Sequence, residues 1–125
     1  MISTDFIKHS PETKPFWDAA AAGRFVLPRC RLCRRTHWYP RGFCPHCLST
    51  TLDWEESSGD GEIHSFSVNR MGEPYVLAYI TLNEGLIILT NVIEVDPATL
   101  SIGTKVKVLF KPGVGQAPVP LFTVR

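Results

Sequence analysis

The sequence lacks the features that direct a protein to a membrane or to a polyanion. No stretch reaches the roughly 20 apolar residues of a membrane-spanning helix, and the first ten residues hold no basic region followed by an apolar run. Thirteen Lys and Arg residues stand against twelve Asp and Glu, and a formal net charge of +1 gives no strong field for DNA, RNA or anionic lipid. We therefore expect a cytoplasmic protein, and its net charge does not indicate a particular class of binding partner.

Recognisable catalytic motifs are also missing. The sequence holds no nucleophile elbow, P-loop, dinucleotide-binding glycine pattern or paired-carboxylate motif. Gly59 and Gly61 favour a sharp bend over a phosphate cradle, because no helix start is expected after them. His64 lies in an expected strand with no carboxylate spaced to orient its ring, which favours a structural role. We predict no catalytic residue in this chain.

Four cysteines form two C-x-x-C pairs, Cys30–Cys33 and Cys44–Cys47, with ten residues between the pairs. In a reducing cytosol this spacing favours zinc bound by four thiolates over two disulfides, four unrelated thiols or a rubredoxin-type iron. Four protein ligands leave no open position for water or substrate, so the zinc is expected to be structural. For the same reason we interpret His37 and His46 as surface residues or as outer partners of the ligands.

The N-terminal region predicts a short helix over residues 10–22. Ser10 or Thr13 can cap its start, prolines lie near its beginning, and Gly23 follows its alanine run. Phe16 and Trp17 are its large apolar side chains. Packing within the fold is favoured for them, and docking on another subunit stays open.

The sequence after Gly59 is rich in β-forming residues. We expect five strands, at 61–69, 75–82, 86–95, 104–110 and 120–125. The second and third are nearly continuous apolar runs joined by a tight link at 83–85, which predicts a central hairpin buried on both faces. The fourth alternates Lys and Val, as a strand with one face in water does. Five short strands that close on themselves match the size of an oligonucleotide/oligosaccharide-binding (OB) barrel.

The order of these parts resembles the DUF35 family. The resemblance covers nearly the whole chain and is carried by Cys30-x-x-Cys33, Tyr39-Pro40-Arg41, Cys44-Pro45-His46-Cys47, the segment 58–63, Pro74-Tyr75, the segment 82–85, Ile102-Gly103 and the segment 120–122. One departure is Arg34, where family members commonly carry Gly. The resemblance implies a mainly β fold with an N-terminal helical segment (1–24), a rubredoxin-like zinc ribbon (25–57) and a five-stranded OB-fold domain (58–125).

The resemblance also implies a function. Such proteins are small accessory subunits of enzymes that act on acyl-CoA, either thiolase-like (thiolase, acyltransferase or aldolase) or MaoC-like hydratases. By this interpretation the chain is not itself catalytic, belongs to a hetero-oligomer, and supports the binding or transfer of a coenzyme A ester. The identity of the partner, the acyl group and the stoichiometry stay open.

Two sets of candidate residues follow from this interpretation. An OB barrel offers a groove with aromatic and basic side chains, and Arg70, Tyr75 and Lys111 are the candidates for contact with CoA. A partner interface is expected at aromatic and Arg residues, for which the candidates are Phe16, Trp17, Trp38, Tyr39 and Arg41. The alternative function is a nucleic-acid-binding module, since zinc ribbons and OB folds both serve that role, but the near-zero net charge disfavours it.

Overall fold

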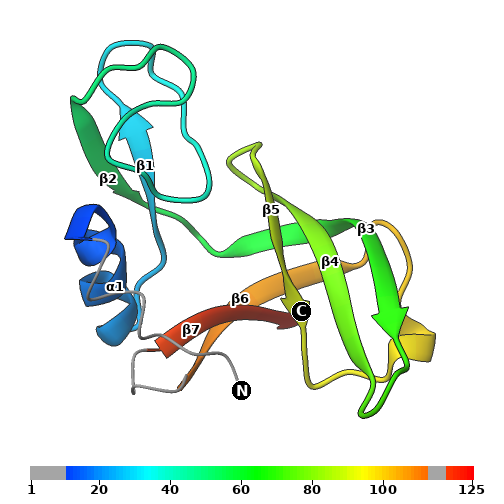
Figure 1. Ribbon diagram of the computed structural model, residues 1–125. Helices are drawn as coiled ribbons and strands as arrows, with labels where there is room; N and C mark the ends of the chain where they lie inside the picture. The colour runs from blue at the N-terminus through cyan, green and yellow to red at the C-terminus, as the bar shows by residue number, and fades with distance from the viewer. Residues whose placement is uncertain (1–10, 113–117) are drawn as a thin grey trace. The chain divides into compact units, whose positions relative to one another are not determined.

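The computed structural model describes residues 11–112 and 118–125 (Figure 1). Its elements are η2 (Pro11–Thr13), α1 (Lys14–Ala21), β1 (Val26–Cys30), β2 (Leu52–Glu56), β3 (Asp60–Asn69), β4 (Tyr75–Leu82), β5 (Ile87–Val92), η3 (Pro97–Thr99), β6 (Lys105–Pro112) and β7 (Pro118–Val124). Strands dominate, a helix precedes them, and five of the strands close into a barrel. The predicted fold class is thereby confirmed.

The chain forms two compact units. The ribbon unit comprises Met1–Ser57 and Phe110–Val119, and the barrel unit comprises Ser58–Leu109 and Pro120–Arg125. The first division falls between Ser57 and Ser58, where the predicted ribbon and OB-fold domain also meet. The predicted helical segment 1–24 lies in the same unit as the ribbon.

Helix α1 is shorter than the predicted span 10–22, but two of the predicted capping residues flank it. Thr13 occupies the N-cap position, and Pro lies in the first turn, where a missing N–H costs nothing. At the other end Gly23 adopts φ +78°, and its N–H donates to the Ala20 carbonyl at 2.9 Å. This left-handed residue ends the helix because a side chain would be strained there.

The ribbon unit is held by an aromatic cluster beneath α1. Phe16 is fully buried, and its ring lies 5.0 Å from Trp17, 5.3 Å from Trp38 and 6.1 Å from Phe25, measured between centroids. Phe110 extends the cluster through an edge contact with Phe25 at 6.5 Å. Edge-to-face pairs of this kind add to the stabilisation from burial alone. The packing role that the sequence favoured for Phe16 and Trp17 is the one that the structure shows.

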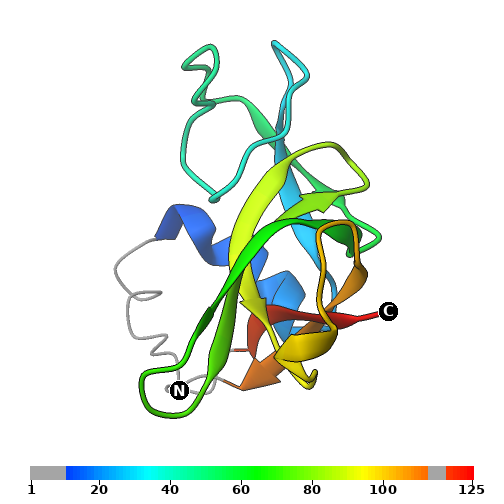
Figure 2. The same ribbon diagram turned by 90° about the vertical axis from the view of Figure 1, so that its right-hand side faces the viewer.

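The barrel unit closes in the order β3-β4-β5-β7-β6 (Figures 1 and 2). Neighbours pair antiparallel from β3 to β5, whereas β5 and β7 run parallel through Val92 and Phe122. The interior is filled by side chains that are at most 3% exposed: Ile63, Val76, Ala78, Ile80, Leu82, Ile88, Val92, Val106 and Phe122. At Gly61 β3 lies so close to β4 that an added Cβ would be 2.6 Å from the Thr81 carbonyl oxygen.

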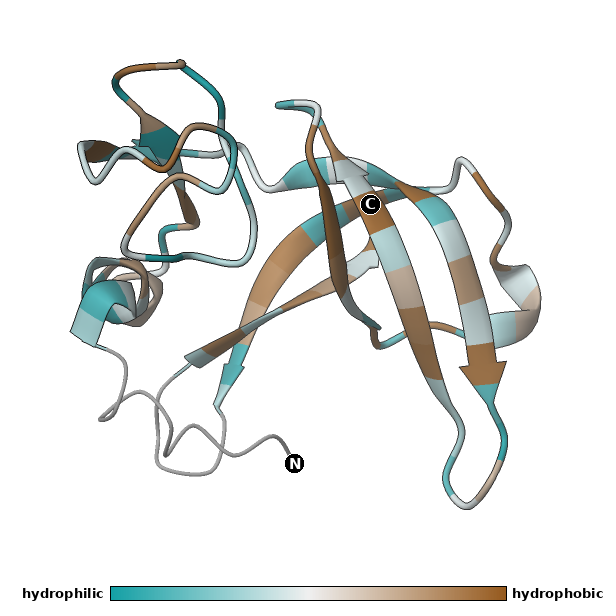
Figure 3. Ribbon diagram, turned by 45° about the horizontal axis from the view of Figure 1, so that its top comes forward, coloured by the Kyte–Doolittle hydropathy of each residue, from teal (hydrophilic) through white to brown (hydrophobic). Residues whose placement is uncertain are grey.

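The expectation that the β4–β5 hairpin is buried on both faces was wrong. Residues of β4 alternate between buried positions (Val76, Ala78, Ile80) and exposed positions (Tyr75, Leu77, Tyr79). A closed barrel has a single interior, so a strand can bury only one of its two faces inside it. Colouring by hydropathy shows apolar residues along β5 and over much of β4 (Figure 3).

Within the described residues, no helix is long and apolar enough to cross a membrane.

Candidate metal centre

The four cysteines converge at one end of the β1–β2 hairpin. Their Sγ atoms all lie within 4.8 Å of one another, with 3.5 Å between Cys30 and Cys47 and 3.6 Å between Cys33 and Cys44. Zn–S bonds of about 2.3 Å at tetrahedral angles separate sulfurs by about 3.8 Å. The cluster therefore fits a zinc ion with four thiolate ligands, and zinc would fix the two loops to each other without an open coordination position.

The two C-x-x-C loops repeat one backbone pattern. The N–H of Cys30 donates to the Arg35 carbonyl and that of Cys44 to the Ser49 carbonyl, at 2.9 and 2.8 Å. The residue four positions after each leading cysteine donates back to it, and that residue is left-handed in both loops, with φ +68° at Arg34 and +66° at Leu48. Gly adopts a left-handed backbone conformation without strain. This explains why members of the DUF35 family commonly carry Gly at the position that Arg34 occupies here.

Backbone N–H groups point at the leading sulfur of each loop. The Sγ of Cys30 accepts from Leu32 at 3.3 Å and from Cys33 at 3.5 Å, and the Sγ of Cys44 accepts from His46 at 3.4 Å. The Cys33 N–H is the main cause that lowers the pKa of Cys30 from 9.0 to about 6. A thiolate is thus available at neutral pH, which is the form that binds a metal.

The fourth thiol behaves in the opposite way when no cation is present. The Ser49 N–H lowers the pKa of Cys47, but burial and the neighbouring sulfurs outweigh it and raise that pKa to about 11. The pKa of Cys44 is lowered by the N–H groups of Cys47 and His46, which prevail over its burial. Four thiolates at this separation repel one another, so a dication is needed before all four lose their protons.

Salt bridges brace the hairpin that carries the cysteines. Arg29 of β1 pairs with Glu55 of β2, and Arg31 of the first cysteine loop pairs with Asp53 of β2 at 2.6 Å. The Arg31 guanidinium holds the pKa of the Asp53 carboxyl below its usual range. All four side chains are partly exposed, so solvent screens both pairs and neither is a strong source of stability.

The two histidines near the cysteines have different surroundings. His46 is exposed, as the sequence interpretation allowed. His37 is only 4% exposed, so its interpretation as a surface residue was wrong, and neither ring nitrogen has a hydrogen-bond partner within the described residues. Burial lowers the pKa of His37, and the charges of Arg41 and His46 lower it further. The ring is therefore neutral at physiological pH.

The candidate interface residues divide into a packed group and an exposed group. Phe16, Trp17 and Trp38 belong to the aromatic cluster of the ribbon unit. Tyr39 and Arg41 are exposed and line an open hollow of about 500 Å³ together with Glu12, Thr13, Pro40, Gly42 and Phe43. Of the five candidates, these two therefore offer side-chain surface to a partner.

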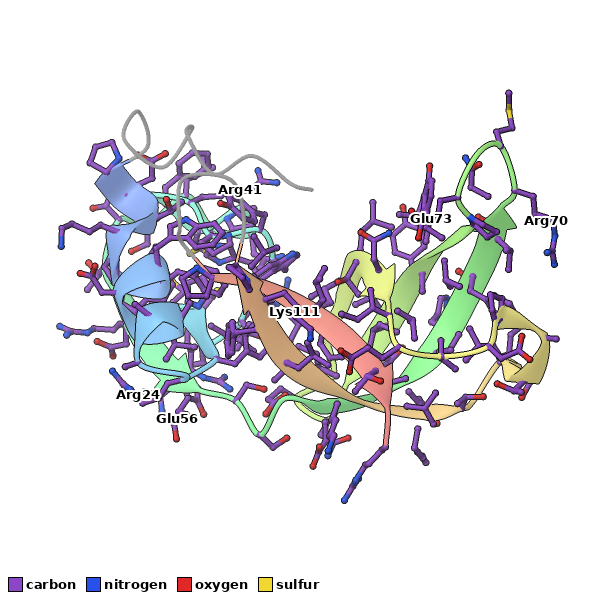
Figure 4. The ribbon with its side chains drawn as sticks, turned by 90° about the horizontal axis from the view of Figure 1, so that it is seen from below. Arg24, Arg41, Glu56, Arg70, Glu73 and Lys111 are labelled. Carbon is purple, nitrogen blue, oxygen red and sulfur yellow. The ribbon has the colours of Figure 1, made fainter. Side chains whose placement is uncertain are left out.

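The candidate CoA residues are not brought together by any described contact. Arg70 lies in the turn between β3 and β4, with Glu73 across the turn from it (Figure 4). Tyr75 begins β4, and its hydroxyl accepts from the Asn69 amide at 2.9 Å. Lys111 belongs to the segment that clusters with the ribbon unit, so it is separated from the other two by the division between the units.

Sequence reasoning missed an exposed apolar face on the barrel. Tyr75, Leu77 and Tyr79 of β4 and Ile87 and Leu89 of β5 are each between 40% and 49% exposed. The signal was present in the sequence, because two adjacent strands with nearly continuous apolar runs cannot bury both faces in a five-stranded barrel.

Two family profiles match the sequence. One is described as the rubredoxin-like zinc ribbon domain of ChsH2 and matches residues 17–53, and the other is the C-terminal OB-fold domain of ChsH2 and matches residues 54–111. Fold and site thus define a zinc-ribbon protein that carries an OB-fold barrel. A DUF35 domain-containing scaffold protein of Methanothermobacter thermautotrophicus is 31% identical over 91 residues, which are 66% of this chain and 68% of that protein. The chain belongs to the DUF35 family.

Two further similarities involve larger assemblies. A probable enoyl-CoA hydratase alpha subunit of Thermomonospora curvata is 32% identical over 114 residues, which are 86% of this chain and 36% of that protein. The chain thus spans about a third of the length of this relative. A chain in the solved structure of an Ltp2-ChsH2(DUF35) aldolase superposes with a TM-score of 0.78 at 28% identity, and the match covers 90% of this chain and 94% of that one.

Proposed function

We propose that this chain is an accessory subunit that binds a thiolase-like or MaoC-like enzyme and supports the binding or transfer of an acyl-CoA, without being catalytic itself. The observation that carries the proposal is the match, over 90% of the chain, to a chain of the Ltp2-ChsH2(DUF35) aldolase. The relatives named as an enoyl-CoA hydratase subunit and as a scaffold protein support the same class of role.

The metal centre is consistent with this role. Its four thiolates fill a tetrahedral site, so zinc would order the ribbon without meeting a substrate. Within the ribbon unit, Tyr39 and Arg41 are the proposed contacts to the enzyme, since both are exposed beside a hollow. At the barrel, Arg70 and Tyr75 are the proposed contacts to CoA, and Lys111 is proposed as a further cation for its phosphates.

Co-expression with a thiolase-like or MaoC-like enzyme subunit from the same organism tests the proposal. We expect a stable complex by size-exclusion chromatography and native mass spectrometry, and a fall in the enzyme's activity when this chain is omitted. Titration of acetyl-CoA into the complex and into its Arg70→Ala form tests the CoA contact separately. An enzyme that is fully active and stable alone would overturn the accessory role.

A further inference from the structure

The outer surface of β4, β5 and the second half of β3 (residues 65–69) carries no charged side chain. Glu62 of β3 pairs with Thr81 at the edge of this surface and forms a salt bridge with Lys105 at 3.0 Å. Register and burial place ten residues of these strands on the outside: Ser65, Ser67, Asn69, Tyr75, Leu77, Tyr79, Thr81, Ile87, Leu89 and Asn91. The barrel unit has ten charged residues, and all of them lie at other positions of the described chain. We call this ten-residue surface the neutral face.

The apolar members of the neutral face are contiguous. Tyr79 pairs with Leu89 across β4 and β5, and the Thr81–Ile87 and Leu77–Asn91 pairs flank it. On the other side of β4, Ser65 and Ser67 stand opposite Tyr79 and Leu77. Leu77, Tyr79 and Leu89 line an open hollow of about 190 Å³ together with the two serines, Phe66 and Ala78. The face is therefore a built surface with a depression at its centre.

Its area is that of a functional patch. Tyr75 and Tyr79 are each 48% exposed, so the two rings alone leave on the order of 200 Å² of largely apolar surface in water. Leu77, Ile87 and Leu89 are exposed to a similar extent and bring the total to about 400 Å². Patches of this size on soluble proteins commonly mark a binding surface.

The charge of the face excludes a polyanion. The β4–β5 surface is the one on which OB folds usually hold oligonucleotides, and its tyrosines offer stacking surfaces. Nucleic-acid binding also needs cations that neutralise phosphates, and the neutral face has none. A membrane surface fits no better, because interfacial anchors combine apolar residues with Lys or Arg. A partner that complements the neutral face therefore presents an uncharged, apolar surface. The centres of protein–protein interfaces have this character.

The area of the face also disfavours a second copy of this chain as its occupant. Two copies joined through the neutral face would together bury about 800 Å², which is below the roughly 1,200–2,000 Å² of a stable interface. A larger chain that covers the face and extends beyond it meets that requirement. We propose that the neutral face is where the enzyme subunit docks, with an apolar, uncharged surface of that subunit seated over Leu77, Tyr79 and Leu89. This inference rests on the proposed function and adds the location and chemistry of the contact.

The test compares two double variants of equal charge in co-expression with a thiolase-like or MaoC-like enzyme subunit from the same organism. Leu77→Lys with Leu89→Lys places two cations on the neutral face, and both side chains point outward, so the barrel core is untouched. Ile102→Lys with Val124→Lys is the matched control, since both residues are exposed and apolar and lie off the face. Leu77→Met with Leu89→Met preserves the apolar character. Amide exchange of β3 to β5 confirms folding of each variant.

We expect the face variant to weaken the complex by at least about tenfold, and the control and methionine variants to bind as the unchanged chain does. Hydroxyl-radical footprinting should show Tyr75, Leu77 and Tyr79 protected in the complex and reactive in the free chain. Undiminished binding by the face variant overturns the inference while the proposed function stands. If the isolated chain forms a dimer that the face variant cannot form, the occupant is a second copy and the inference is overturned. If the chain binds an oligonucleotide and the face variant does not, the occupant is a nucleic acid and the inference is likewise overturned. Failure of the unchanged chain to form any complex refutes the proposed function and the inference together.

Discussion

Arg34 holds a left-handed backbone conformation that a residue with a Cβ adopts at a cost. Its φ of +68° follows from the hydrogen bonds of the first cysteine loop, which require the turn whichever residue occupies the position. We predict that Arg34→Gly raises the free energy of unfolding of the zinc-bound chain by about 0.5–1 kcal/mol, because the relief of strain exceeds the added entropy of the unfolded chain.

Chemical denaturation followed by tryptophan fluorescence measures this change, because Trp17, Trp38 and Trp54 all lie in the ribbon unit. Arg35→Gly is the matched control, since Arg35 has no positive φ and should lose stability. Equal effects of the two substitutions would contradict the strain argument.

The sequence identified the four ligands because C-x-x-C spacing is a local pattern. It indicated the special position of Arg34 only through resemblance.

Gly61 is required by the close approach of two strands. A Cβ there would meet the Thr81 carbonyl oxygen at 2.6 Å and the Ile80 side chain at 2.9 Å. We predict that Gly61→Ala destabilises the barrel by about 1–3 kcal/mol, because backbone atoms have to move. Gly42→Ala, whose nearest neighbour would lie at an ordinary 3.5 Å, should change stability by about 0.5 kcal/mol or less. Thermal unfolding followed by far-ultraviolet circular dichroism distinguishes the two, and a mild effect at Gly61 would show that β4 yields there.

At the scale of elements, α1 is fixed by one of its faces. Phe16 is fully buried among three other aromatic rings, whereas Lys14 and Asp18 form an exposed pair at 2.7 Å. We predict that Phe16→Ala lowers the free energy of unfolding by about 3–5 kcal/mol because it leaves a cavity. Asp18→Ala should cost about 0.5 kcal/mol or less. Guanidinium titration of both variants provides the comparison, and similar midpoints would mean that the helix is not held by this ring.

The elements themselves were largely predictable, whereas the surroundings of their side chains were not. The tight link at 83–85 and the alternation after Lys105 are local signals, and both appear in the structure. The burial of His37, the packing of Trp38 and the exposure of Leu77 depend on which segments meet in space, and no short pattern encodes those meetings. In β4 the apolar run predicted a strand correctly, but its second buried face was wrong because the barrel is closed.

At the scale of the whole molecule, the two units depend on zinc to different extents. The ribbon unit is organised around the cysteines, and the barrel unit has its own closed strands and core. We predict that a chelator abolishes the cooperative transition seen by tryptophan fluorescence and leaves the amide protection of β3 to β5 in place. The complex with the enzyme should weaken at the same chelator concentration, because the proposed ribbon contacts at Tyr39 and Arg41 are lost while the neutral face of the barrel stays folded. Loss of barrel protection in parallel would show that the units fold as one.

The response to pH follows from the direction of the thiol pKa values. The folded chain lowers the pKa of Cys30 from 9.0 to about 6. The Cys30 thiolate therefore contributes to the stability of the folded chain, and this contribution is lost as the pH falls through about 6. Protons then compete with the metal for the sulfurs. We predict that the apparent affinity for zinc falls as the pH is lowered and that zinc is released in acid, that re-addition of base restores binding, and that His46→Ala leaves the profile unchanged. A colorimetric zinc assay across pH 4–8 measures the release, and a shifted profile in the His46 variant would make His46 a ligand.

The ribbon unit is discontinuous in sequence, because Phe110–Val119 joins residues that precede the barrel. The Phe25–Phe110 contact belongs to this closure, and the ribbon family profile, which ends at residue 53, does not include it. A shortened chain that stops after Ser57 therefore loses part of its own ribbon unit. Exchange of ribbons between relatives would require two crossovers, one on each side of the barrel sequence, and this ties the inheritance of the metal-binding half to that of the barrel.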